Sequence, residues 1–495
     1  MLWRKLCKGG PQVNYDVVIG LEIHVALLTE SKFLCSCSTT FGAPPNTQCC
    51  PVCLGLPGAL PVVNEKAVEY AVKAGFALNC EVHSFSRFDR KNYFYPDLPK
   101  AYQITQDKYP LCTNGYLEYY MGEELCRTAI TRLHMEEEAG KLIHSAGSIV
   151  NSEYSLVDCN RAGIPLIEIV TAPDLKSPRQ ARLFLEQLRL VMRWIGVSDG
   201  KMEEGSLRCD ANISLKPQGS PILGTKVEIK NLNSFRALER ALEYEAERQR
   251  MVLEGGGKIK QESRTWDERS DRTMPMRSKG DAPDYRYFPE PDLPPLRMDP
   301  AWIARLKESL PELPLERLWR LERDFGLSRY EATFLVNYPD FGELFLELAS
   351  EGCDNTAVVN LLMGDYARLA RENGHLEPRR LEELLQIVAE GQITSSQSKT
   401  VLEELFRSPL GPREIVQAKG LEVVRDSEQL RQAVREVLKQ NPDLVERYKA
   451  GEQKLMGFFV GLVMRAAEGK ADPKMVNQLL REELAAADGS EIQPV

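Results

Sequence analysis

The sequence of 495 residues lacks any apolar run that approaches the length of a membrane span. Its longest apolar run, Leu455 to Met464, ends at Arg465 and is typical of a buried helix. The N-terminus has basic residues but no apolar segment typical of a secretory signal. We therefore expect a cytoplasmic protein that has no membrane partner and keeps its cysteines reduced.

Two nucleotide-binding motifs are also missing. Neither GxxxxGK[ST] nor GxGxxG occurs, so a nucleotide would be held by metal ions and a sheet and not by a P-loop. The net charge of −9 excludes a polycation, so any nucleic acid would have to be bound through a local patch or through shape. The chain is too long for a single hydrophobic core and should divide into several domains.

Cysteine is concentrated in one place. Five of the twelve cysteines lie between Cys35 and Cys53. Cys35 and Cys37 form a CxC pair, Cys50 and Cys53 form a CxxC pair, and the segment between them is rich in glycine and proline. Two such pairs on two turns can present four thiolates to Zn²⁺, although free structural thiols are the alternative. A site with four thiolates has no open position, which predicts a structural role.

The secondary-structure pattern predicts an α+β protein. Strands with a few helices dominate up to about residue 290, and the remainder is almost entirely helical. Five prolines between Tyr287 and Pro300 predict an extended linker, and Ser408 to Gly420 predicts a second break. We expect three domains: residues 1–295 with an antiparallel sheet, helical residues 296–410, and a small helical domain at 411–495.

Charged side chains occupy one face of several predicted strands, because side chains alternate along a strand. In "VVIGLEIHV" the apolar residues point one way and Glu22 and His24 the other. The other side chains placed in this way are Arg208, Asp210 and Asn212 in "LRCDANISL" and Lys226, Glu228 and Lys230 in "TKVEIKN". "PLIEIV" carries a lone Glu168 inside an otherwise apolar strand. "RLHMEEEAG" adds Glu136, Glu137 and Glu138, among which we do not choose.

The charged faces have two interpretations. For any single strand, a solvated face is the simpler one. Glu168 is harder to explain in this way, because a carboxylate among Leu, Ile and Val is rarely buried unless it is paired or binds a metal. Together the strands offer oxygen ligands that suit Mg²⁺ and cations that suit a transferring phosphoryl group.

Basic and aromatic residues alternate in "RKNYFYPDLPKAY". Lys91, Tyr93 and Lys100 of this segment could stack on a base and bind a phosphate. A packed loop with solvated cations would have the same composition, so both interpretations stay open.

Several long strings resemble one family. "VIGLEIHV", "FGAPPNTQCCPVCLGLPGALPVVN", "FDRKNYFYPDLPKAYQITQ", "TRLHMEEEAGK", "GIPLIEIVTAPD", "KMEEGSLRCDANIS", "EIKNLNSF" and "DYRYFPEPDLPPL" are similar to the B subunit of the aspartyl/glutamyl-tRNA(Asn/Gln) amidotransferase. The string "KLMGFFVGLVMRAAEGKADPKMVNQLL" resembles the tail of the same subunit. The resemblance extends from about Tyr15 to about Leu484.

The resemblance implies a ligase. Such a subunit phosphorylates the side-chain carboxylate of mischarged Glu-tRNA(Gln) or Asp-tRNA(Asn) with ATP, and ammonia then displaces the phosphate. It implies a catalytic cradle domain similar to glutamine synthetase and guanido kinases, and a tRNA-binding tail. The magnesium ligands implied are Glu22, His24, Glu137, Glu168 and Glu228, with Asp210 as a further catalytic residue and Lys91, Tyr93, Lys100, Lys226 and Arg208 near the substrate.

The resemblance also implies partners. The chain lacks the Gly/Ser-rich signature of a Ser-Ser-Lys amidase, so ammonia would come from a glutaminase A subunit in a heterotrimer with a small C subunit. Two alternatives are a free-standing carboxylate–amine ligase and a non-catalytic tRNA-binding scaffold. The sequence does not decide between Asp-tRNA(Asn) and Glu-tRNA(Gln) as the physiological substrate.

Overall fold

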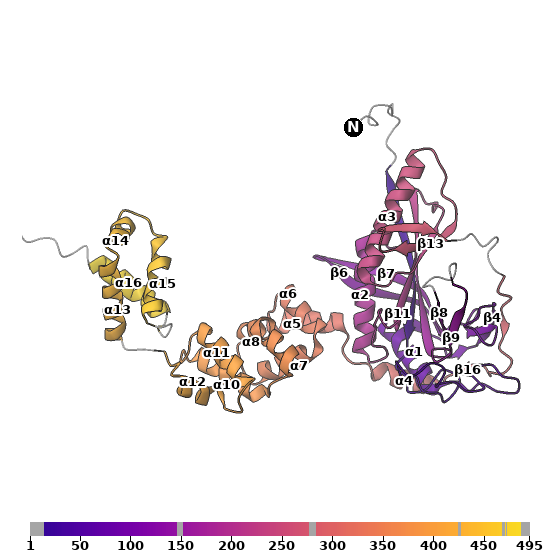
Figure 1. Ribbon diagram of the computed structural model, residues 1–495, viewed down its shortest axis with the longest axis horizontal. Helices are drawn as coiled ribbons and strands as arrows, with labels where there is room; N and C mark the ends of the chain where they lie inside the picture. Colours follow the sequence, from indigo (N-terminus) through magenta and orange to yellow (C-terminus); the bar gives the residue numbers. More distant parts are fainter. Residues whose placement is uncertain are drawn as a thin grey trace, which may run out of the picture. The chain divides into compact units, whose positions relative to one another are not determined.

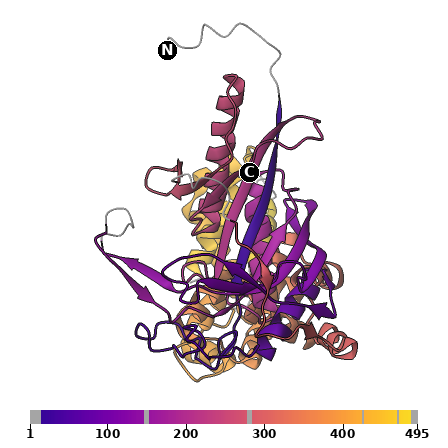
Figure 2. The ribbon, with the colours of Figure 1, turned by 90° about the vertical axis from the view of Figure 1, so that its right-hand side faces the viewer.

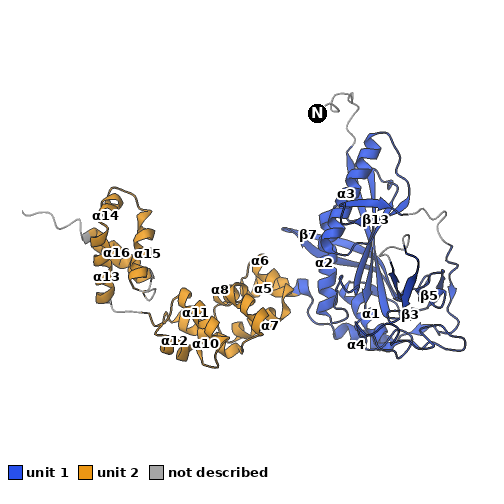
Figure 3. Cartoon of the chain, viewed as in Figure 1, with its two compact units in different colours: residues 1–316 blue, residues 317–495 orange. Residues whose placement is uncertain are grey.

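The computed structural model describes residues 14–145, 152–276, 284–423, 427–467, 471 and 473–486. The N-terminal segment considered above for a signal lies outside these residues. The chain forms two compact units, residues 1–316 and 317–495, which are coloured separately in Figure 3. Each unit is described here by itself.

A nine-stranded sheet forms the centre of the first unit (Figure 1). Its strands, in spatial order, are β14 (Arg272–Pro275), β13 (Glu262–Asp267), β12 (Val227–Lys230), β11 (Leu207–Pro217), β1 (Tyr15–Ala26), β10 (Pro165–Thr171), β7 (Glu124–Glu137), β6 (Cys112–Met121) and β2 (Glu81–Val82). All neighbours are antiparallel except β12 and β13, which are parallel, so the expected antiparallel sheet is a mixed one.

Three helices cover one face of this sheet: α1 (Glu65–Ala77), α2 (Pro178–Trp194) and α3 (Phe235–Glu254). Figure 1 shows α2 and α3 lying along the sheet. Each helix begins at a residue whose side chain accepts a backbone N–H, namely Asn64, Ser177 and Ser234. Alternate residues of β1, from Ile19 to Val25, are buried against these helices, so the intervening residues face the open side.

Shorter strands surround the sheet. β4 (Asp89–Asn92) lies between β5 (Tyr102–Thr105) and β15 (Phe288–Pro289), and β3 (Phe85–Ser86) pairs with β16 (Leu296–Arg297). β8 (Lys141–His144) and β9 (Ser155–Asp158) form a ribbon that projects from the unit, as Figure 2 shows.

The proline-rich segment from Tyr287 to Pro300 is part of the first unit and not a free connection. It contributes β15 and β16, and Leu293 is buried in the main core. The helix that follows, α4 (Pro300–Glu308), adds Leu306 to the same core. Strands of only two residues need few hydrogen bonds to their neighbours, so they tolerate prolines on either side. The proline-rich segment can therefore pair with β4 and β3 and still be extended.

The second unit is helical. Its helices are α5 (Pro314–Phe325), which crosses the boundary between the units, α6 (Arg329–Asn337), α7 (Pro339–Ser350), α8 (Asn355–Leu361), the π-helix η1 (Leu362–Tyr366), α9 (Ala367–Asn373), α10 (Pro378–Ala389), α11 (Ser395–Leu405), α12 (Pro412–Lys419), α13 (Ser427–Gln440), α14 (Pro442–Lys449), α15 (Leu455–Ala466) and α16 (Pro473–Ala486). Within it, α13, α15 and α16 share a separate hydrophobic core that includes Leu430, Val434, Phe459, Val463 and Leu480.

These observations confirm an α+β fold. Within the described ranges, no helix combines the length and the hydropathy that crossing a membrane requires. The three domains expected from the sequence stay a prediction, and the separate core of α13, α15 and α16 is the observation that supports the last of them.

We predict that Phe459→Ala destabilises the α13–α16 bundle without affecting the first unit. Phe459 is fully buried and packs edge-on against Tyr448, so its truncation should cost about 3–5 kcal/mol. Hydrogen exchange should show faster opening of α13, α15 and α16 and unchanged protection of the nine-stranded sheet. Equal loss of protection in both units would contradict the division into independent cores. Phe458→Ala is the matched control, because Phe458 is 49% exposed.

Candidate functional site

The open face of the sheet carries a row of charged side chains. The strand register places His24 of β1 opposite Glu168 of β10 and Arg208 of β11, and it places Glu168 opposite His134 of β7. Two residues before His24 on β1, Glu22 lies opposite Asp210 of β11. The alternation that buries one face of each strand therefore brings charged residues from four strands together on the other.

His24, Glu136 and Glu168 form a compact group at the centre of this row. His24 Nε2 lies 3.2 Å from Glu136 Oε1 and 3.5 Å from Glu168 Oε2. His134 Nε2 lies 3.3 Å from the same oxygen of Glu168. The Glu136 side chain is 2% exposed and the His24 side chain 24% exposed, so the group is closed on one side and accessible on the other.

The electrostatics of this group favour a cation. Burial opposes a charge on His24, but hydrogen bonds and charges from Glu136 and Glu168 outweigh it and raise the pKa of His24 to about 10. Burial likewise favours a neutral Glu168, yet His134 and His24 lower the pKa of Glu168 below its usual range. A proton held so firmly between two carboxylates marks a position of strongly negative potential.

An unpaired atom supports the same conclusion. Glu136 Oε2 is buried and has no hydrogen-bond partner in the part of the chain that the structure describes. Leaving a buried carboxylate oxygen unpaired is costly, and binding to a metal ion removes that cost. One imidazole nitrogen and two carboxylate oxygens, all within 4.8 Å of one another, could hold a divalent cation.

A second charged group adjoins the first, on β1, β11 and β12. Asn212 Nδ2 donates to Glu22 Oε1 at 2.9 Å, and Lys230 Nζ lies 2.8 Å from Asp210 Oδ2 and 2.7 Å from Glu228 Oε1. Although burial opposes its charge, Asp210 and Glu228 raise the pKa of Lys230 above its ordinary value. This group therefore holds a fixed cation, Lys230, between two of its three carboxylates.

Ser263 of β13 completes the second group, because its Oγ donates to Glu228 Oε2 at 2.5 Å. Burial would raise the pKa of Glu228, but Lys230 and Ser263 together lower it.

Glu137 and Glu138 lie apart from both groups. Glu137 pairs with Lys100 and accepts the Ile104 N–H at 2.9 Å; both charged side chains are buried. Glu138 pairs with Arg208 and with Arg161, whose Nη2 lies 3.0 Å from Glu138 Oε2. The structure thus brings Glu136, and not Glu137, into the group with His24 and Glu168. The magnesium-ligand role expected for Glu137 stays a prediction that this geometry does not support.

The four cysteines of the CxC and CxxC pairs meet in one cluster, whose Sγ atoms all lie within 4.8 Å of one another. The Cys50 N–H donates to Cys53 Sγ at 3.1 Å. A hydrogen bond from Cys35 is the main cause that lowers the pKa of Cys53 to about 4, and the nearby charge of Lys32 acts in the same direction. These four thiols could hold a metal ion.

Lys32 is a buried cation beside this cluster. Its Nζ lies 3.6 Å from Cys53 Sγ and 3.2 Å from the Cys159 carbonyl oxygen, and the residue has no exposed surface. A buried ammonium needs negative charge next to it, so Lys32 fits a cluster of thiolates better than a cluster of neutral thiols.

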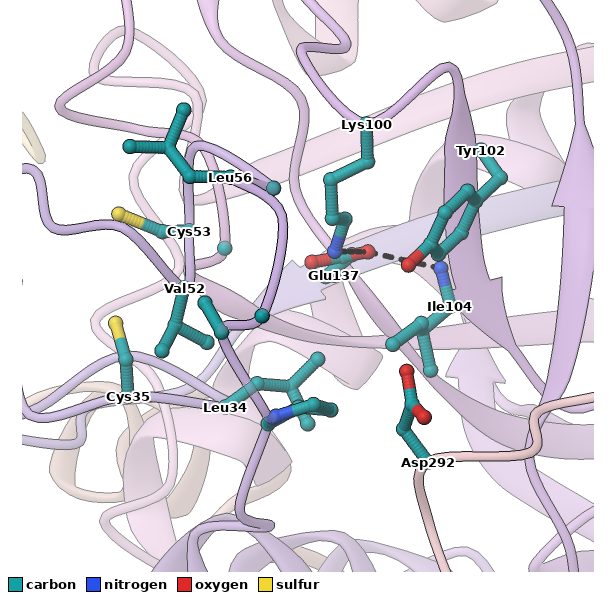
Figure 4. Close-up of a pocket in the computed structure, with 15 residues that line it drawn as sticks. Leu34, Cys35, Val52, Cys53, Leu56, Lys100, Tyr102, Ile104, Glu137 and Asp292 are labelled. Carbon is teal, nitrogen blue, oxygen red and sulfur yellow. Dashed lines mark hydrogen bonds and ion pairs between the residues drawn. The ribbon is translucent and has the colours of Figure 1, made fainter.

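A pocket of about 180 Å³ separates the cysteine loop from the Glu137–Lys100 pair. Figure 4 shows Cys35, Cys53, Val52 and Leu56 on one side, Lys100, Glu137 and Ile104 on the other, and Leu34 between them. The remaining expected substrate-binding residues lie elsewhere in the first unit: Lys226 lines a second pocket beside Glu22, and Lys91 and Tyr93 lie near Tyr285.

Sequence reasoning missed two members of the site. His134 was not singled out, and Glu136 was not distinguished from its neighbours. Leu133 and Met135 are buried in the core, so the same alternation that was applied to β1 places His134 and Glu136 on the open face.

Comparison with known proteins identifies the family. The model of the GatB/GatE catalytic domain matches residues 17–304, and that of the GatB domain matches residues 343–484. The B subunit of the aspartyl/glutamyl-tRNA(Asn/Gln) amidotransferase of Moorella thermoacetica is 52% identical over 95% of this chain and 100% of its own length. The B subunits of the same name from Thermoanaerobacter pseudethanolicus (50%, covering 96% of this chain and 100% of the relative) and Persephonella marina (51%, covering 95% and 99%) are similar.

The chain belongs to the family of aspartyl/glutamyl-tRNA(Asn/Gln) amidotransferase B subunits. The resemblance drawn from the sequence strings is therefore confirmed, and so is the expected enzyme class, an amidotransferase.

We predict that Glu136→Gln and Glu168→Gln each weaken Mn²⁺ binding to the open face by at least about tenfold. Each substitution keeps the shape of the side chain but removes an anionic ligand, and even residues that only orient ligands typically contribute about 10–100-fold. Electron paramagnetic resonance titration of the folded protein with Mn²⁺ measures the effect. Glu137→Gln, next in the chain, should leave the affinity within about twofold. A larger loss of Mn²⁺ affinity in Glu137→Gln than in Glu136→Gln would contradict this prediction and would support Glu137 as the metal ligand.

Proposed function

We propose that the open face of the sheet phosphorylates the side-chain carboxylate of mischarged Glu-tRNA(Gln) or Asp-tRNA(Asn). A carboxylate oxygen of the aminoacyl group attacks the γ-phosphorus of ATP and ADP leaves. Ammonia then attacks the acyl phosphate carbon, phosphate leaves, and the amide of Gln-tRNA or Asn-tRNA results. The observation that supports this proposal most strongly is the group of His24, Glu136 and Glu168 on a chain of this family.

The charge balance of the face supports a metal-dependent reaction. Five carboxylates line it: Glu22, Glu136, Glu168, Asp210 and Glu228. They would repel the phosphates of a nucleoside triphosphate unless cations lay between them. We propose that His24, Glu136 and Glu168 hold Mg²⁺, which when bound neutralises charge on the phosphates and on the transferring phosphoryl group.

The protein's own cations complete the site. Lys230 is fixed between Asp210 and Glu228, and Arg208 lies opposite His24 in the register. Positive charge that is already oriented costs no reorganisation when the phosphoryl group transfers. Asp210 and Glu228 position Lys230, and together with Glu22 they offer further oxygen ligands under this proposal.

A pocket on the same face suits ATP. It has a volume of about 310 Å³, lies beside Glu22 and is lined by Val18, Gly20, Leu223 and Lys226 among others. Along β1 the open face changes from Val18 and Gly20 to Glu22 and His24, that is, from apolar and small to charged. We propose that the base occupies the apolar end, so that the phosphates extend toward the metal ligands.

The partners follow from the family. The relatives are named as B subunits, so we propose that an A subunit supplies ammonia, that a small C subunit completes the heterotrimer, and that the helical tail binds the tRNA. The cytoplasmic location and the likeness of the cradle to glutamine synthetase and guanido kinases stay predictions. A non-catalytic tRNA scaffold is the alternative, and release of ADP distinguishes the two.

We predict that the assembled complex releases ADP when mischarged tRNA is present, and that Glu168→Gln lowers this rate on the order of 10²-fold or more. The reason is the loss of metal-based stabilisation at the phosphoryl-transfer step. Measurement of ADP release with Glu-tRNA(Gln) and Asp-tRNA(Asn) in turn also identifies the substrate. Glu239→Gln is the control, because Glu239 pairs with Arg182 on the helices of the opposite face. Absence of ADP release from the unaltered complex would favour the scaffold.

We also predict one Zn²⁺ per chain, held by Cys35, Cys37, Cys50 and Cys53. Replacing Cys50 with Ser removes one of four thiolates, so zinc should be lost and the loop should become sensitive to protease. Metal analysis by mass spectrometry checks the content. The neighbouring change Cys49→Ser should keep the zinc, because Cys49 lies outside the cluster. A Cys50→Ser protein that retains one zinc per chain would refute the assignment.

A further inference from the structure

An aromatic cluster lies beside the metal-ligand group and has no role in the chemistry proposed above. It joins two segments far apart in the sequence: the loop after β4 and the segment before β15. The ring of Tyr93 lies 6.1 Å from that of Tyr285 at 73°, and Tyr285 lies 6.0 Å from Tyr287 at 67°. Both contacts are edge-to-face, the arrangement that aromatic pairs prefer.

The cluster is held in place by Asn92. Its backbone N–H donates to the Tyr285 carbonyl at 3.0 Å, and its Nδ2 donates to the carbonyls of Tyr285 at 3.2 Å and Arg286 at 2.9 Å. Arg286, between the two tyrosines, has a φ of 44°, which is unfavourable for a residue with a side chain. The hydrogen bonds from Asn92 maintain this backbone conformation at Arg286, so the three tyrosine rings have fixed positions.

The cluster lies near the end of β7 that carries Glu136. Asn92 of β4, next to Tyr93, is paired with Tyr102 of β5, and the Ile104 N–H of β5 donates to Glu137, the neighbour of Glu136. Burial is the main cause that raises the pKa of Tyr93, and the charges of Glu136, Asp97 and Glu137 raise it further. Burial also raises the pKa of Tyr287, with added contributions from Asp107, Tyr285, Glu168 and Glu136. Both hydroxyl groups therefore lie within the field of the group that contains Glu136.

Next to this cluster, one aromatic side chain is open to solvent. Phe94 directly follows Tyr93 and is 91% exposed, more than any other large hydrophobic residue in the described ranges. Lys91 Nζ lies 5.0 Å from the Tyr285 ring centre, and no described carboxylate lies within salt-bridge distance of it. An exposed ring and a cation beside a rigid aromatic surface are the features with which proteins bind unpaired nucleotides.

The chemistry of the substrate limits where its base can lie. In an aminoacyl-tRNA the amino acid is esterified to the ribose of the 3′-terminal adenosine. Eight covalent bonds for Asp, or nine for Glu, therefore separate the carbon of the side-chain carboxylate from the adenine N9, which keeps the two within about 10 Å. If the carboxylate is phosphorylated beside His24, Glu136 and Glu168, the adenine must be bound close by.

We propose that the ring of Phe94 stacks on the 3′-terminal adenine of the mischarged tRNA. Lys91 lies where it can approach the phosphate of that nucleotide, and Tyr93, Tyr285 and Tyr287 separate the base from the metal ligands. This proposal rests on the proposed function. A protein partner that covers Phe94 is the competing explanation, and it is less favoured because the strand that precedes the cluster pairs with β5, which is hydrogen-bonded to Glu137 beside the carboxylates that the aminoacyl group must reach.

The test uses the assembled complex and two inhibitors. One is 3′-glutamylamido-adenosine, in which an amide replaces the labile ester, and the other is the same compound without the base. The measured quantity is the inhibition constant of each compound against ADP release with mischarged tRNA. In Phe94→Ala, the inhibitor with adenine should bind about 10- to 100-fold more weakly, and the inhibitor without the base should be unaffected.

Two further variants sharpen the result. Phe94→Trp retains a stacking surface and should keep the affinity for the adenine compound. Phe41→Ala removes another exposed ring, 71% exposed, from the loop between the cysteine pairs, and should change neither inhibition constant. Neither Phe41 nor Phe94 is buried, so these variants should fold.

Three results would overturn the proposal. Unchanged inhibition by the adenine compound in Phe94→Ala would show that the ring does not bind the base. Equal weakening of both compounds would place the contact elsewhere on the substrate. Loss of complex assembly in Phe94→Ala, with RNA-fragment binding by the isolated chain unchanged, would assign Phe94 to a protein interface. If the unaltered complex releases no ADP, the proposed function fails instead, and direct binding of the two compounds still tests Phe94.

Discussion

The site depends on the burial of one face of the nine-stranded sheet under α1, α2 and α3. Because those helices remove one face from water, the apolar residue at every second position of β1, β7, β10 and β11 is fixed inward. A shift of one residue in any of these strands would bury charges such as Glu22 or Asp210 beneath the helices, at a cost of several kcal/mol each. The hydrophobic core thus sets the register, and the register sets which charged residues meet.

The carboxylates on and near the open face repel one another, and several of them are compensated by a lysine or arginine in direct contact. Lys230 compensates Asp210 and Glu228, Lys100 compensates Glu137, and Arg161 with Arg208 compensates Glu138. Glu22 has no lysine or arginine partner among the described residues and accepts a hydrogen bond from Asn212 instead. Glu136 and Glu168 also have no such partner among the described residues, and there His24 carries the positive charge. The absence of a permanent cation at that position is what makes it suitable for an exchangeable metal ion.

The pattern of the sequence was sufficient for the strands and the cysteines. Glu22, His24, Asp210 and Glu228 were placed on polar faces by alternation alone, and the structure has them there. Glu168 was singled out as a lone carboxylate in an apolar strand, and it lies opposite His24. The run of Glu136, Glu137 and Glu138 was different. Alternation from the buried Leu133 and Met135 gives the direction of Glu136, but β7 ends at Glu137, so alternation does not determine the directions of Glu137 and Glu138. The positions of Glu137 and Glu138 depend on Lys100, Arg161 and Arg208, which come from distant segments.

Other features could not be predicted for a related reason. Tyr285 and Tyr287 lie about 190 residues beyond Tyr93 in the chain, and only the pairing of β15 with β4 brings them together. The proline-rich composition of that segment predicted an extended chain but not a partner for it. Composition describes local conformation well, whereas contacts between distant segments depend on the whole fold.

The strand register also suggests from which ends of the strands the two substrates of the proposed reaction would approach. On β1 the open face passes from Val18 through Glu22 to His24, and Glu136, paired with Leu166, lies beyond His24 at the end opposite the pocket that contains Val18. Under the proposed function, ATP would extend toward His24 from one end of the strands and the aminoacyl group from the other. Phosphoryl transfer requires the attacking and leaving oxygens to lie roughly in line on either side of phosphorus. Under the proposed function, antiparallel strands with a binding surface at each end and metal ligands between them would satisfy this requirement without any change in the sheet.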